Sequence, residues 1–97
     1  MRTFADGMAV RVPVAGAFDS GAERIVAVSD EEIAEAMLLY FCATHNVVEG
    51  AGAAPLAALM QEKDLMAGRR VALIASGGNV DTGWFRQVLE GATPVPA

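Results

Sequence analysis

Several features that would point to a compartment or a partner are missing from this sequence. Its single cysteine, Cys42, cannot form an internal disulfide, and no apolar leader follows Met1, so we expect a cytoplasmic protein. No stretch approaches the roughly 18 to 20 uncharged apolar residues of a membrane span, which argues against a membrane protein. The net charge of −5 comes without a basic patch, which argues against a nucleic-acid partner.

Apolar residues, by contrast, are abundant. They make up 54% of 97 residues, which is more than so short a chain readily buries, and the length allows one domain at most. The surplus predicts an apolar surface that a partner covers.

The hydrophobic pattern predicts an α/β fold. We expect strands over 23–28, where the four residues 25–28 are apolar, and over 71–75, where all five are, because such runs are typical of strands buried on both faces. We expect helices over 30–45 and 52–65, and a third between an Asp81 cap and Gly91; a short fourth could lie near 15–19. The expected architecture is therefore a partial open parallel sheet with two main strands, flanked by three to four helices, with a loose tail at 92–97.

A small-residue corner, Ser76-Gly77-Gly78-Asn79, follows the second expected strand. It offers unhindered backbone N–H groups, a hydroxyl and an amide at the carboxyl end of a strand, where ligands sit in open α/β sheets. No lysine follows the glycines, so the corner is not a Walker loop. The structural alternative is that Ser76 only closes a strand-to-helix turn.

Three motifs, ADGMAV (5–10), EGAGA (49–53) and SGGNVD (76–81), resemble the carboxy-terminal part of the threonine dehydratase and serine racemase family. These are pyridoxal-phosphate enzymes of the tryptophan-synthase-β fold type. The resemblance runs from about residue 3 to 81 and implies that residues 1–97 are a single partial domain, cut from the large cofactor-binding domain. Val10 stands where serine racemases can present a hydroxyl, which favours a dehydratase-like relative.

The resemblance also implies roles for individual residues. The Ser76 hydroxyl would donate a hydrogen bond to the cofactor ring nitrogen and keep the ring neutral, which makes a weaker electron sink and suits β-elimination. Glu49 would lie beside the ring, and the Gly7 backbone would face the imine side. The implied cofactor-binding set is Ser76, Gly77, Gly78, Asn79, Glu49 and Gly7.

For two of these residues the sequence leaves an ordinary alternative open. Glu49 could be an exposed carboxylate that caps the next helix, and Asp6-Gly7 could be a simple turn. His45 and Cys42 have no partners at metal-ligand spacing, so we assign no metal site.

Pyridoxal chemistry of this kind needs a lysine to hold the cofactor, and the only lysine, Lys63, lies in a polar stretch far in sequence from every motif. We assign no catalytic residue. The expected function is that of the carboxy-terminal portion of a threonine/serine dehydratase-like lyase, which converts a small hydroxy amino acid to a 2-oxo acid and ammonia. The isolated chain would bind no cofactor and be inactive. The alternative is an interaction module that pairs with a second copy or with a complementary upstream chain.

Overall fold

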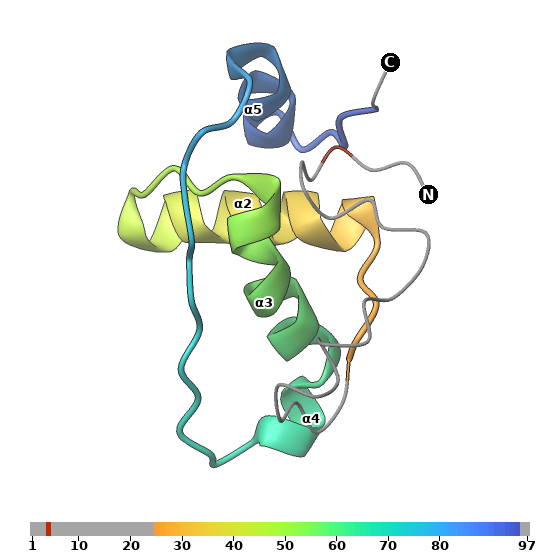
Figure 1. Ribbon diagram of the computed structural model, residues 1–97, viewed down its shortest axis with the longest axis vertical. Coiled ribbons are helices and arrows are strands. Elements are labelled where there is room, and N and C mark those ends of the chain that lie inside the picture. The colour runs from red at the N-terminus through yellow and green to blue at the C-terminus, as the bar shows by residue number, and fades with distance from the viewer. Residues whose placement is uncertain (1–3, 5–24, 96–97) are drawn as a thin grey trace, which may run out of the picture.

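A computed structural model describes Phe4 and residues 25–95. These residues form four helices: α2 (Asp30–Thr44), α3 (Gly50–Gln61), α4 (Lys63–Met66) and α5 (Thr82–Leu89). Figure 1 shows α2 crossing α3, with α5 on the opposite side of α2 from α4. Residues 67–81 have no helix or strand and connect α4 to α5 along one side of the molecule (Figure 1).

The predicted α/β sheet is wrong for the described part of the chain, where residues 25–28 and 71–75 form no strand. Apolar runs of this kind predict a buried strand, but a strand is stable only beside another strand whose backbone it can pair with. Here Ile74 is 77% exposed and Ile25 is 58% exposed, so neither run is covered. The expected segment at 15–19, and residues 23 and 24, lie outside the described residues.

The start of α2 confirms the helix predicted for 30–45. The Glu32 backbone N–H donates to Ser29 Oγ (3.1 Å), and the Ser29 N–H donates to Glu32 Oε1 (2.9 Å). This reciprocal pair satisfies two N–H groups that no helical carbonyl can reach. The helix ends at His45, whose positive φ of 59° breaks the helical path.

The helix predicted for 52–65 is shifted and divided in the structure. α3 begins two residues earlier, at Gly50, and Pro55 lies inside it. A proline there removes one N–H, so it costs a hydrogen bond without stopping the helix. Leu65, the last residue of the predicted helix, belongs to the separate helix α4 and is 63% exposed.

Both predicted ends of the last helix are confirmed. Asp81 Oδ1 accepts the Trp84 backbone N–H (3.0 Å), which caps α5. At the other end Gly91 has a φ of 85°, a conformation that suits glycine, and its N–H donates to the Val88 carbonyl.

The hydrophobic core lies where α2 packs against α3 and α5. Alanines supply much of the buried surface, and their short side chains let the helix backbones approach closely. The buried residues include Ile33, Ala36, Met37, Val48, Ala53, Ala57 and Val88.

The acid stability of α2 should depend on Glu32. Its hydrogen bond from the Ser29 backbone N–H, and then that from the Gln61 amide, hold the pKa of the Glu32 carboxyl below its ordinary value of 4.5. A carboxyl whose pKa is lowered on folding adds stability above that ordinary value, and this stability is lost as pH falls through the folded pKa. We expect Glu32→Gln to flatten the acid limb of the unfolding free energy, measured by urea titration from neutral pH to about pH 3. Glu31→Gln is the control, and equal acid limbs for the two variants would contradict the prediction.

Candidate functional site

The small-residue corner 76–79 lies against the start of α3. The Glu49 backbone N–H donates to the Gly77 carbonyl (2.9 Å). This hydrogen bond joins two motifs through residues that are 28 positions apart in the sequence. A Cβ added to Gly78 would lie 2.6 Å from the Val47 carbonyl oxygen, and one added to Gly52 would lie 3.1 Å from the Gly77 oxygen. Only glycines therefore permit this approach. The structure thus brings the EGAGA and SGGN motifs together.

Glu49 is the charged side chain nearest to the glycines. It is half-buried and occupies the N-cap position of α3, yet its side chain makes no capping hydrogen bond. Its carboxylate lies instead against Gly77, where a Cβ would overlap Glu49 Oε1. The alternative that the Glu49 carboxylate caps the helix is therefore wrong.

Ser76 lies at the outer side of the corner. Its side chain is exposed, and among the described residues its hydroxyl makes no hydrogen bond. The hydroxyl is free to donate to a ligand. The corner holds Gly77 and Gly78 beside Glu49, with Asn79 next along the chain, whereas Gly7 lies outside the described residues.

A hollow of about 220 Å³ lies next to this corner. Glu49 and Asn79 line it, as do two aromatic rings, those of Phe4 and Trp84, which meet edge to face with centroids 5.9 Å apart. The remaining lining residues are Gly50, Val80 and Asp81. From the sequence, Asp81 and Trp84 were expected only as parts of the last helix, with no site role. The only sequence signal for them was their nearness to the glycines, since Asp81 follows Gly78 by three residues and Trp84 by six.

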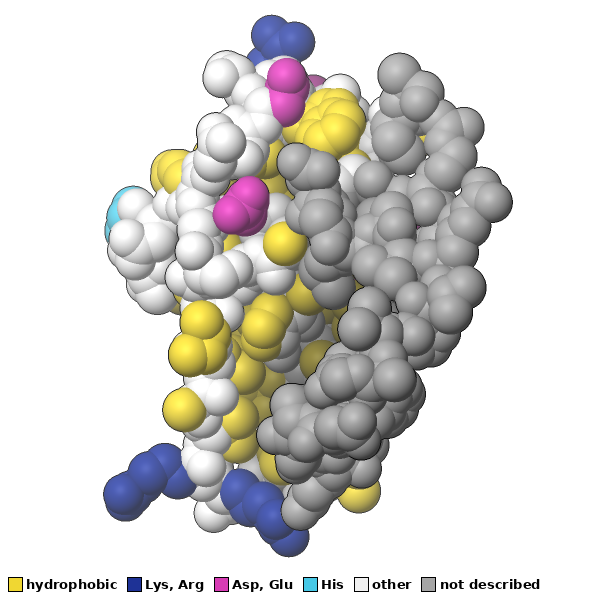
Figure 2. Space-filling model, in the orientation of Figure 1, with side chains coloured by type: hydrophobic (Ala, Val, Ile, Leu, Met, Phe, Trp, Pro, Cys, Tyr) yellow, Lys and Arg dark blue, Asp and Glu magenta, His cyan; other side chains and the backbone are white. Residues whose placement is uncertain are grey.

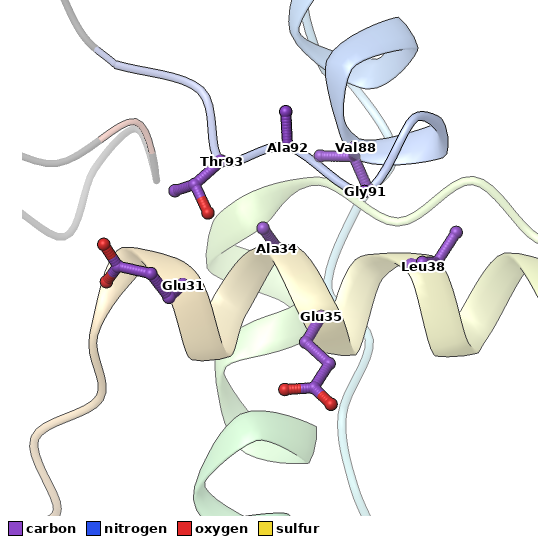
Figure 3. Close-up of a pocket in the computed structure, with 8 residues that line it drawn as sticks. All are labelled: Glu31, Ala34, Glu35, Leu38, Val88, Gly91, Ala92 and Thr93. Atoms are coloured by element: carbon purple, nitrogen blue, oxygen red, sulfur yellow. The ribbon is translucent and has the colours of Figure 1, made fainter.

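A second hollow, of about 260 Å³, lies between α2 and the chain that follows α5 (Figure 3). Ala34 and Leu38 form its α2 wall, whereas the Glu35 side chain points away from α5 (Figure 3). None of the predicted site residues lines it.

The part of the chain that the structure describes shows neither a metal-binding cluster nor a membrane-spanning helix. No group of three or more His, Cys, Asp or Glu side chains is placed to hold a metal ion. No helix there has the length and apolar character needed to cross a membrane.

Comparison with known proteins identifies the family. The family model described as pyridoxal-phosphate dependent enzyme matches residues 1–77. The chain belongs to this family. The resemblance inferred from the three motifs is thereby confirmed at the level of the family.

Three curated relatives of this pyridoxal-phosphate family member are named as ammonia-lyases. L-threonine ammonia-lyase of Thermotoga maritima is 38% identical over 90 residues, which cover 90% of this chain and 22% of the relative. The enzyme of the same name from Geobacter sulfurreducens is 37% identical, covering 91% and 23%. L-threo-3-hydroxyaspartate ammonia-lyase of a Pseudomonas species is 40% identical over 67 residues, covering 69% and 21%.

The chain spans less than a quarter of the length of these relatives. No solved structure matches it significantly.

The corner fits one edge of a pyridoxal ring but offers no covalent anchor. The exposed Ser76 hydroxyl can donate to a ring nitrogen, and Glu49 and Asn79 place polar groups in the neighbouring hollow. Lys63 begins α4, beyond the far end of α3, and a helix of 12 residues places it roughly 18 Å from the corner. The described residues can therefore contact a ring edge, and no lysine among them can reach it.

The approach of the corner to α3 should depend on Gly78. We expect Gly78→Ala to separate the two, because its Cβ would meet a backbone carbonyl that cannot move without shifting the chain. The Glu49 amide proton, which the Gly77 carbonyl protects, should then exchange with solvent faster, as measured by NMR hydrogen exchange. Ser76→Ala, in the same corner but exposed, is the control. An unchanged Glu49 exchange rate in Gly78→Ala would show that the contact does not depend on this glycine.

Proposed function

We propose that the chain forms the ring-edge wall of the pyridoxal-phosphate site in a dehydratase-like lyase acting on a small hydroxy amino acid such as threonine or serine. The observation that carries this proposal is the contact between Glu49 and Gly77, which joins two motifs of the family at one place. The names of three relatives support this reaction class, since these enzymes are named ammonia-lyases of threonine or of 3-hydroxyaspartate.

Each residue of the corner has a separate role in this proposal. Ser76 donates a hydrogen bond to the ring nitrogen without supplying a counter-charge. Gly77 and Gly78 form the floor under the ring. Their missing side chains also keep the corner in place, because a Cβ at either position would clash with Glu49 or with the Val47 carbonyl. Glu49 and Asn79 orient polar groups at the ring edge. Gly7, whose backbone the family resemblance assigns to the imine side of the cofactor, belongs to the proposed set through that resemblance alone.

In this proposal the corner residues position the cofactor ring, and residues outside the proposed cofactor-binding set transfer the protons. Pyridoxal phosphate, when bound, supplies an electron sink that eases loss of the substrate Cα proton and β-hydroxyl. The corner positions the ring, and a hydroxyl in place of a carboxylate at the ring nitrogen favours elimination over transamination. Because Lys63 is remote, the isolated chain is proposed to be inactive and to hold no cofactor, and the lysine is proposed to come from outside these residues.

A specific observation favours the second candidate function, an interaction module. Large apolar side chains stay exposed in the described residues, with Ile74 at 77% and Leu65 at 63%. Figure 2 shows hydrophobic side chains along the connecting segment on this face. A second copy or a complementary chain would remove this surface from water, which favours association.

The role of Ser76 is tested in the protein assembled with a complementary chain that carries the family's lysine segment. We expect Ser76→Ala to retain pyridoxal phosphate roughly fivefold less tightly, the effect of losing one hydrogen bond, and to slow elimination. Retention is measured by equilibrium dialysis and turnover by 2-oxo acid release. Ser76→Thr keeps a hydroxyl and should recover much of the loss, while Lys63→Ala should have no effect. Unchanged retention and rate in Ser76→Ala would refute the ring-nitrogen role.

The interaction module is tested by size-exclusion chromatography with light scattering at micromolar concentration. We expect the unmodified chain to associate and Ile74→Asp to associate less, because a charge placed in this exposed apolar surface must be desolvated on contact. Glu90→Lys, a charge change on the exposed end of α5, serves as the control. A clean monomer for the unmodified chain would exclude pairing of the module with a second copy.

A further inference from the structure

The segment of residues 69–76, which follows α4, combines positive charge with exposed apolar surface. Arg69 and Arg70 are both exposed, and neither side chain forms an ion pair within the described part of the chain. Ile74, four residues further on, is 77% exposed. Figure 2 shows Lys or Arg side chains projecting at the end of the molecule where α4 lies, and hydrophobic side chains along the segment above them. The segment thus offers a cation and a large apolar side chain to a partner surface.

The hollow of about 260 Å³ between α2 and residues 91–93 has a lining that complements this segment. Ala34 and Leu38 form its α2 wall and Val88 lines it from α5, with Ala34 and Leu38 on the side of α2 that faces α5 (Figure 3). Glu31 lines it at the start of α2, is exposed, and forms no ion pair among the described residues. An apolar cavity of about 150 Å³ holds a benzene molecule, so this hollow has room for one branched aliphatic side chain.

We propose that residues 70–74 of one copy dock on this hollow of a second copy, with Ile74 beside Leu38 and Arg70 beside Glu31. The inference rests on the second candidate function, the interaction module, and names its partner and its contact. The spacing agrees, because residues 70–74 of an extended chain span about 13 Å and residues 31–38 of a helix span about 10 Å. A charge pair at one end and an apolar contact at the other fix the direction of the segment along α2.

The two surfaces lie on different sides of the molecule. Figure 1 shows the connecting segment on the side where α2 ends, whereas the residues of α2 that line the hollow belong to its first half. Two copies joined by this contact therefore keep one unoccupied segment and one unoccupied hollow, and a further copy can add at either end. The association is head to tail, and it continues beyond a dimer.

The contact is tested with the full chain by light scattering over a concentration series. We expect the average mass of the unmodified chain to rise past that of a dimer. Arg70→Glu and Glu31→Lys should each weaken association roughly fivefold, because each turns an attractive charge pair into a repulsive one. Glu90→Lys makes the same charge change as Glu31→Lys outside the hollow lining and should associate like the unmodified chain.

Two further samples separate this charge pair from net charge and from folding. A variant with both Arg70→Glu and Glu31→Lys has the net charge of the unmodified chain and exchanges the two partners, so it should recover association. An equimolar mixture of the two single variants should recover it as well, because each supplies the surface that complements the other. Recovery on mixing would exclude a folding defect as the cause of the loss in either single variant.

A plateau at the mass of a dimer, or association that Arg70→Glu and Glu31→Lys leave unchanged, would overturn this contact and leave the interaction module standing. Recovery in neither the double variant nor the mixture would overturn it too. A monomer at every concentration would overturn both the contact and the pairing of the module with a second copy. None of these results bears on the cofactor retention measured with Ser76→Ala.

Discussion

The hydrogen bond from the Glu49 N–H to the Gly77 carbonyl is the constraint on which the candidate site depends. Residues 70–76 make no backbone hydrogen bond within the described part of the chain, so nothing in the preceding segment fixes the position of the corner. The corner is located instead by this bond and by the close approach of Gly78 to Val47. The position of the corner in residues 76–79 is therefore set by contacts between backbone atoms.

The composition of the core explains why so much apolar surface is exposed. α2 and α3 meet through small side chains such as Ala36, Ala53 and Ala57, and this lets the helices approach closely but buries little area per residue. The larger apolar residues Val71, Ile74 and Leu65 lie outside that contact and remain in water. Close helix packing and an exposed apolar segment are thus two consequences of where the sequence places its alanines and its β-branched residues.

The helix ends were predictable because the chemistry that sets them is local. Ser29 and Glu32 are three residues apart, as are Asp81 and Trp84, so a single short window of sequence contains both partners. The strands at 25–28 and 71–75 were predicted from apolar runs that identify a segment able to pair, but not a segment that it pairs with. Pairing is a non-local condition, and the described residues do not supply the partner. For this reason the helices were largely right and the sheet was wrong.

The candidate site divides in the same way. The family resemblance predicted Glu49, Gly77 and Asn79 as site residues, and in the structure Glu49 contacts Gly77 and lines the hollow together with Asn79. Asp81 and Trp84 were identified only from the structure, because they line the same hollow. Gly77 connects the two groups, because the absence of a Cβ there is what leaves space for the Glu49 carboxylate. That carboxylate both lies beside the proposed ring position and lines the hollow with Asp81. A methyl group at residue 77 would displace it, so the ring-edge contact and the charge of the hollow depend on the same missing atom.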